Sequence, residues 1–222
     1  MCITKLDYMK KHIDKGLENS YSYAEYRSHV SDLLSKGLST GDTQSEDLTN
    51  YSSLNDVRMK RLDKTIKITP EVIEKLKGLK CNYTLLVISE GWCGDAAQIM
   101  PVMDKMVSEN ENLNLRIVLR DDNSELMDGF LTNGGRAIPK LILLDAADNT
   151  VLGDWGPRPT GGAQLIKDAK EKFGVVNEDA KTALQKWYLK DKGLSTMQEI
   201  MALLEKAERE QCAAKAAMAA QS

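Results

Sequence analysis

The sequence has few of the residues that usually form metal centres, disulfide frameworks and hydrolase sites. Its 222 residues include four cysteines and two histidines. The cysteines are too scattered for a disulfide framework and lack the spacing of metal ligands, so no metal site is predicted. Neither His12 nor His29 carries a signature of a Cys–His hydrolase, and both are interpreted as ordinary helix-surface or core residues. The four cysteines are Cys2, Cys81, Cys93 and Cys212.

Strong charge and long apolar segments are also absent. The formal net charge is −3 and no run of basic residues occurs, which argues against nucleic acid or an anionic membrane as a partner. Residues 1–16 are charged and amphipathic and lack the apolar stretch of a signal peptide. No segment approaches the roughly 20 apolar residues of a membrane span. A cytosolic location is therefore expected.

The composition is that of a soluble globular protein, with 42% hydrophobic and 28% charged residues. The length fits one core domain of about 100–150 residues plus additions, or two small domains. Residues 1–63 predict a helical N-terminal extension. Within it, helical periodicity covers residues 3–36, a polar loop covers 38–50, and a further helix covers 53–63.

Residues 64–174 have the alternating pattern of an α/β domain. Residues 65–68 alternate like a short strand, and Thr69-Pro70 reads as a cap that begins a helix over 70–79. Tyr83–Ser89 is a continuous apolar run, which is typical of a strand buried on both faces. Residues 175–222 are expected to form C-terminal helices, over 177–190 and 195–211, and a tail. The remaining predicted elements are helices over 94–109, 124–132 and 161–173, and strands over 115–120, 140–144 and 150–154.

The most informative motif is Trp-Cys-Gly-Asp at residues 92–95, where the apolar strand breaks and a helix begins. A cysteine at a helix N-terminus faces unpaired N–H groups and the positive end of the helix dipole, and both favour the thiolate. Asp95 adds a negative charge in the same turn. We therefore expect the pKa of Cys93 to be lowered, but less than in a site without that carboxylate.

Three further features accompany this motif. Pro101 falls inside the following helix, Ile138-Pro139 precedes a strand, and residues 153–159 read Gly-Asp-Trp-Gly-Pro-Arg-Pro. Together with the cysteine motif they resemble the thioredoxin family over residues 64–174, about half of the chain. Bacterial relatives of this type carry Trp-Cys-Gly-Asp-Cys with the same Trp-Gly-Pro-Arg-Pro stretch. This chain looks like a member in which Ala96 replaces the second cysteine.

The resemblance implies a thioredoxin-like α/β fold: a mixed central sheet flanked by helices, here with helical N- and C-terminal extensions. It also implies that the Ile138–Pro139 bond is cis, packs beside the active cysteine and leaves the preceding backbone able to pair with a substrate strand. Cys93 is the implied catalytic residue. The implied substrate-binding residues are Trp92, Gly94, Asp95, Ile138, Pro139, Trp155 and Arg158.

Several of these residues have a simpler interpretation beside the functional one. Trp92 and Trp155 could be ordinary packing aromatics. Arg158 could pair with a thiolate, with a glutathione carboxylate or with an acidic partner, and could equally be a solvated loop arginine. Cys93 itself could be a buried structural cysteine.

Two departures from the family pattern weaken the case for a general disulfide reductase. Ala96 removes the thiol that would resolve a mixed disulfide within one molecule. Val87 stands where thioredoxins keep a buried acid. Cys81 precedes the strand that leads to Cys93, which puts the two about 20 Å apart and beyond disulfide reach. The positions of Cys2 and Cys212 are left open by the sequence.

Two main functions follow. The first is monothiol thiol–disulfide exchange in cell redox homeostasis, in which Cys93 attacks a protein disulfide and an external thiol resolves the product. Glutathione or another low-molecular-weight thiol would be the co-substrate, and no other cofactor is expected. The second is a redox-inactive binding or scaffold module that grips an extended peptide beside Pro139. A cluster-binding role like that of monothiol glutaredoxins is disfavoured, because those proteins use Cys-Gly-Phe-Ser.

Overall fold

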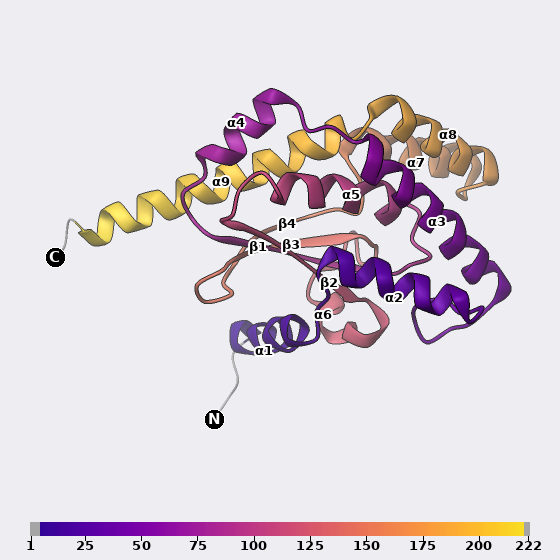
Figure 1. Ribbon diagram of the computed structural model, residues 1–222, viewed down its shortest axis with the longest axis horizontal. Helices are drawn as coiled ribbons and strands as arrows, with labels where there is room; N and C mark the ends of the chain where they lie inside the picture. The colour runs from indigo at the N-terminus through magenta and orange to yellow at the C-terminus, as the bar shows by residue number, and fades with distance from the viewer. Residues whose placement is uncertain (1–4, 220–222) are drawn as a thin grey trace.

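The computed structural model describes residues 5–219, and the side chains of residues 8–213. A four-stranded sheet lies at its centre in the order β2-β1-β3-β4 (Figure 1). β1 pairs with β2 in parallel, whereas the β1–β3 and β3–β4 pairs are antiparallel. This mixed sheet with flanking helices confirms the predicted thioredoxin-like α/β fold. The strands are β1 (Tyr83–Ser89), β2 (Leu113–Leu119), β3 (Lys140–Asp145) and β4 (Val151–Trp155).

Helices cover both faces of the sheet. α4, α5 and α9 lie on one side, and α1 and α6 lie on the other (Figure 1). α3 packs against α5 and α2, while α7 and α8 pack against each other. The helices are α1 (Lys5–Glu18), α2 (Tyr23–Ser35), α3 (Glu46–Thr65), α4 (Pro70–Gly78), α5 (Ala96–Val107), α6 (Ser124–Asp128), α7 (Thr160–Phe173), α8 (Glu178–Asp191) and α9 (Leu194–Ala219), with a 3₁₀ turn at Asp121–Asn123.

The central strand is the clearest match between sequence and structure. Every residue of β1 is buried, as its continuous apolar run predicts for a strand covered on both faces. Val87 of this strand pairs with Ile117 of β2 and Leu141 of β3. β1 is therefore buried and paired on both sides up to the point where the chain enters the cysteine motif.

One hydrophobic core joins the central sheet to both helical extensions. It contains Tyr26 and Met59 from the N-terminal helices, and Leu184 and Ile200 from the C-terminal helices, beside the residues of the sheet. All four of these side chains are at least nine-tenths buried. The helices outside residues 64–174 thus complete the core of the sheet. The domain boundaries at residues 63/64 and 174/175 stay predictions.

The N-terminal half differs from the prediction in three places. The periodic stretch 3–36 is two helices, because Tyr21 pairs with Ile117 at the sheet edge and Ser22 starts α2 with a capping box. α3 begins at Glu46 rather than at residue 53, since the Ser45 side chain accepts a hydrogen bond from the backbone N–H of Leu48. Residues 65–68 form no strand: α3 runs through the first of them.

The predicted helix over 124–132 also ends early, at Asp128. The remaining helices and strands agree with the prediction to within two residues, except that α9 continues to Ala219. Within residues 5–219, no helix combines the length and the apolar character required to cross a membrane.

Candidate functional site

Cys93 lies in the turn between β1 and α5, and its side chain packs against the Ile138–Pro139 segment. That peptide bond is cis. The Cys93 thiol donates a hydrogen bond to the carbonyl oxygen of Ile138, with an Sγ–O distance of 3.4 Å. The backbone N–H of Ala96 in turn donates to Cys93 Sγ across 3.5 Å. Two motifs that lie about 45 residues apart in the sequence therefore meet at one sulfur atom.

The segment 153–159 also lies beside Pro139, and Gly156 makes this close approach possible. Gly156 has a φ of +119°, and a Cβ there would lie 2.4 Å from the carbonyl oxygen of Pro139. Neither the backbone angle nor the contact admits a side chain. The segment 153–159 is thereby held against the loop that carries Pro139, at the rim of the cysteine site.

The electrostatics of Cys93 differ from the prediction. Only 7% of the residue is exposed, and this burial, with the neighbouring charge of Asp95, raises the pKa of the thiol to about 12. The backbone N–H groups of Ala96 and Asp95, and the Arg158 guanidinium, lower the pKa by less. The expectation of a lowered pKa is therefore wrong, because desolvation outweighs the favourable helix terminus.

Asp95 connects the cysteine motif to an arginine and a tyrosine. Its carboxylate pairs with Arg158 at 2.7 Å and accepts a hydrogen bond from the Tyr188 hydroxyl at 2.8 Å. Burial raises the pKa of Asp95, while Arg158 and the Tyr188 hydrogen bond oppose that rise. Arg158 is therefore paired within the chain, and its binding of a thiolate, a glutathione carboxylate or an acidic partner stays a prediction.

Helices from both extensions cover the cysteine motif. On α3, Asn55 donates to the carbonyl of Gly91 across 3.0 Å, and Arg58 donates to the Asn55 side chain across 2.9 Å. On α8, Gln185 accepts a hydrogen bond from Gln98 of α5 at 2.8 Å. A Cβ placed on Gly94 would lie 3.6 Å from Arg58 and 3.8 Å from Gln185. We call Asn55 and Arg58 with Gln185 and Tyr188 the helical cover.

Sequence reasoning missed all four cover residues. They lie outside residues 64–174, where the sequence motifs were found. Their positions on α3 and α8 have no pattern that distinguishes them from surface polar residues. Only the folded chain brings the two helices together over residues 91–98.

The two tryptophans of the predicted site, Trp92 and Trp155, have packing partners. The Arg120 guanidinium lies 4.8 Å from the ring centroid of Trp92, a cation–π contact. Trp155 donates from Nε1 to Glu199 on α9 at 2.7 Å, and the other oxygen of Glu199 accepts from the backbone N–H of Thr160. Trp155 therefore helps to fix α9 against the start of α7.

A buried carboxyl group does occur near the cysteine, although not at Val87. Val87 is fully buried, as is Glu90, three residues before Cys93. Glu90 accepts a hydrogen bond from the backbone N–H of Asp121 at 3.0 Å, and burial raises its pKa. The fully buried Tyr26 of α2 is close enough to Cys93 and Glu90 for both to raise its pKa further, after the larger effect of burial.

The other described cysteines lie at the opposite end of β1. The thiols of Cys81 and Cys212 are within 4.8 Å of each other. β1 has seven residues and so extends about 20 Å, which separates this pair from Cys93 by more than disulfide reach. Among the described residues, no cysteine is placed to resolve a mixed disulfide at Cys93. Cys2 lies outside them.

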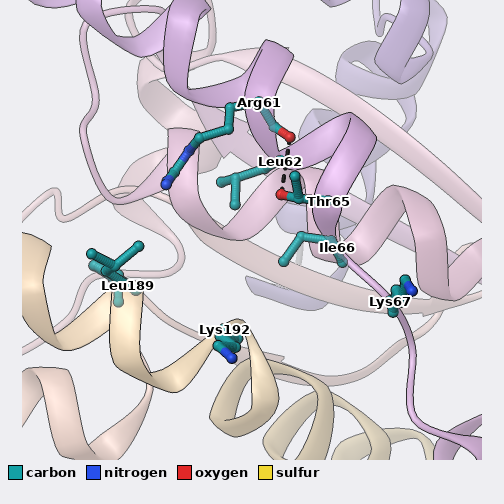
Figure 2. Close-up of a pocket in the computed structure, with 8 residues that line it drawn as sticks. Arg61, Leu62, Thr65, Ile66, Lys67, Leu189 and Lys192 are labelled. Carbon is teal, nitrogen blue, oxygen red and sulfur yellow. Dashed lines mark hydrogen bonds between the residues drawn. The ribbon is translucent and has the colours of Figure 1, made fainter.

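A groove of about 450 Å³ runs along the outside of the cover, between the end of α3 and α8 (Figure 2). Arg61 and Lys67 line one side of it and Lys192 the other, around the apolar Leu62, Ile66 and Leu189. Tyr188 also lines the groove, and its hydroxyl reaches Asp95. The Tyr188 side chain thus connects the groove to the cysteine motif.

Comparison with known proteins supports the fold. A family model described as thioredoxin matches residues 41–170. A solved structure of a Pseudomonas aeruginosa protein of unknown function is similar, with a TM-score of 0.56, 19% identity, and coverage of 84% of this chain and 99% of that one. An HIV epitope-scaffold protein has a TM-score of 0.52, 21% identity, and coverage of 83% and 98%. No curated protein matches the chain.

Proposed function

The chain belongs to the thioredoxin family, and from that premise we propose that it carries out monothiol thiol–disulfide exchange at Cys93. The observation that carries the proposal is the contact of Cys93 Sγ with the Ile138 carbonyl beside cis-Pro139. A sulfur in this position lies next to backbone that can pair with an extended segment of a disulfide-bonded protein. The Ala96 N–H, which points at the same sulfur, would stabilise a thiolate once it forms.

The exchange proceeds in two balanced steps. The Cys93 thiol loses its proton, and the thiolate attacks one sulfur of the substrate disulfide. The substrate S–S bond breaks, a mixed disulfide with Cys93 forms, and the departing thiolate takes up a proton. An external thiolate such as glutathione then attacks the mixed disulfide, which regenerates the Cys93 thiol and leaves the external thiol bonded to the released sulfur. A cytosolic location, as predicted from the sequence, would supply that thiol.

The reaction requires the helical cover to open. With a pKa of about 12, only about one Cys93 in 10⁵ would be a thiolate at pH 7 in the closed form. Movement of α3 or α8 would admit water and the substrate together, which removes the desolvation that raises the pKa. The groove beside Tyr188, with its three cationic residues, is where an acidic segment of the substrate would contact the cover.

Turnover of a small disulfide in the presence of glutathione tests the proposal. Wild-type protein should reduce hydroxyethyl disulfide at a measurable rate, and Cys93→Ser should not. The matched control is Cys212→Ser, which removes a thiol at the far end of β1 and should keep the wild-type rate. Equal rates in the wild type and Cys93→Ser, or no turnover in either, would rule out exchange at Cys93.

The burial and the raised pKa of Cys93 also favour a second function, a redox-inactive binding module. An extended peptide would then pair with the backbone at Ile138 without chemistry at sulfur. This function predicts that a bound protein partner stays bound to Cys93→Ser with unchanged affinity. Covalent capture of partners by the wild type, and its loss in Cys93→Ser, distinguishes exchange from simple binding.

A further inference from the structure

A second group of reactive side chains lies at the start of β1, away from Cys93. Cys81 precedes the strand, and Glu208 and Cys212 lie one turn apart on α9, so that both face the same side of the helix. One thiol or carboxylate atom from each of the three residues lies within 4.8 Å of the other two. We propose that Cys81, Glu208 and Cys212 form a binding site for a thiophilic divalent cation, with Zn²⁺ as the expected ion.

The donor set and its size suit zinc. Zn²⁺ takes four tetrahedral ligands, and cysteine sulfur and carboxylate oxygen are among those it prefers. With Zn–S bonds of about 2.3 Å, the sulfurs of such a site lie about 3.8 Å apart, so small side-chain movements from the observed arrangement suffice. Cys212 is exposed, and a water molecule can therefore supply the fourth ligand.

The carboxylate is already fixed by its surroundings. Glu208 accepts hydrogen bonds from the Tyr83 hydroxyl at 2.7 Å and from the backbone N–H groups of Lys80 and Cys81 at 2.8 and 3.3 Å. Hydrogen bonds of this kind orient metal-ligating carboxylates and tune their affinity. Glu208 thus keeps its position whether or not an ion is bound.

Charge also favours a dication. If both thiols ionise beside Glu208, three negative charges lie together. A bound Zn²⁺ would neutralise this charge and displace the thiol protons, so its affinity should increase with pH. This group could not be predicted from cysteine spacing, because Cys81 and Cys212 lie 131 positions apart in the sequence.

Metal titration of the full-length chain under reducing conditions tests the site. We expect one Zn²⁺ per chain, measured by competition with a chromogenic chelator, and a thiolate-to-metal charge-transfer absorption when Cd²⁺ replaces it. Cys212→Ser should weaken Zn²⁺ binding at least about tenfold and reduce the Cd²⁺ band, because only the Cys81 thiolate remains. Cys93→Ser is the matched control and should bind as the wild type does.

Thermal unfolding shows whether each variant is folded, so that a folding defect is not mistaken for a loss of Zn²⁺ binding. Zn²⁺ should raise the unfolding temperature of the wild type and of Cys93→Ser, but not that of Cys212→Ser, whose exposed position tolerates serine. Absence of Zn²⁺ binding by the reduced wild type would overturn the proposal. Equal Zn²⁺ affinity in Cys212→Ser and in the wild type would also overturn it. A Cys81–Cys212 disulfide whose reduction creates no Zn²⁺ site would overturn it as well.

Discussion

The two ends of β1 place cysteines in opposite environments. At one end Cys93 is 7% exposed, contacts a backbone carbonyl, and has no second thiol beside it among the described residues. At the other end Cys81 and Cys212 lie within 4.8 Å of each other and of a carboxylate, and Cys212 is open to solvent. Surroundings thus set the two ends of β1 apart: Cys93 is the covered thiol proposed for exchange, and the buried Cys81 with the exposed Cys212 is the pair proposed for a metal ion.

The largest expected effect comes from removing each thiol separately. Cys93→Ser should abolish thiol–disulfide exchange, whereas Cys212→Ser should leave it unchanged because its sulfur is about 20 Å away. Zn²⁺ binding should show the reverse pattern. A glutathione-coupled disulfide assay and a chelator competition, both performed on both variants, measure the two activities. Loss of both activities in one variant would show that the two ends of β1 are not independent.

Alkaline pH should affect the covered thiol more than the exposed one. The pKa of Cys93 is raised from its usual 9.0 to about 12, so the unfolded chain loses this proton at a lower pH than the folded chain. The stability that this thiol contributes is present below pH 9 and is lost as the pH rises toward 12. The loss should be at most about 1.4 kcal/mol per pH unit.

Urea unfolding of the wild type and Cys93→Ala between pH 8 and pH 11 measures this loss of stability. The difference between the two proteins in free energy of unfolding should change by roughly 1.4 kcal/mol per pH unit at its steepest. The free energy of unfolding should fall more steeply with pH for the wild type. Cys212→Ser is the control and should retain the wild-type slope more closely. Parallel curves for the wild type and Cys93→Ala would contradict a raised pKa at Cys93.

Charge variants beside Cys93 should shift its pKa in opposite directions. Asp95→Asn removes a negative charge that raises the pKa, and Arg158→Gln removes a positive charge that lowers it. We expect shifts of about one unit, downward for Asp95→Asn and upward for Arg158→Gln. The rate of Cys93 alkylation as a function of pH measures both. Shifts of the same sign would show that the cover moves in these variants and that charge is not the controlling factor.

The smallest expected effect is on the cover itself. Tyr188→Phe removes the hydrogen bond from α8 to Asp95 but leaves the Arg158 pair in place, at a net cost of roughly 1–1.5 kcal/mol. Cys93 should then be alkylated roughly five- to tenfold faster at neutral pH, because the cover opens more often. Tyr8→Phe, an exposed residue of α1 on the other face of the sheet, is the control and should leave the alkylation rate unchanged.

The sequence predicted the parts of the molecule that depend on local pattern. The bounds of β1, the turn at Cys93 and the helix start at Thr69-Pro70 are determined by neighbouring residues, and all three were predicted correctly. The alternation at 65–68 was wrong as a strand: α3 continues through Thr65, and residues 66–68 form neither helix nor strand.

What could not be predicted depends on contacts between distant segments. The pKa of Cys93 depends on burial, and its neighbourhood includes side chains such as Tyr188, 95 residues away in the sequence. The capping box at Ser22 was a readable signal that the prediction passed over. The grouping of Cys81 with Cys212 required the path of α9, which no local pattern reveals.

Mass spectrometry of the protein after exposure to glutathione disulfide tests the monothiol proposal most directly. The wild type should form a mixed disulfide of glutathione with Cys93, located by peptide mapping, that persists after the excess is removed and disappears only when a thiol is added. In Ala96→Cys the adduct should resolve without added thiol into a disulfide between Cys93 and the introduced cysteine. A wild-type protein that never forms the adduct at Cys93, or that loses it unaided, would contradict monothiol exchange.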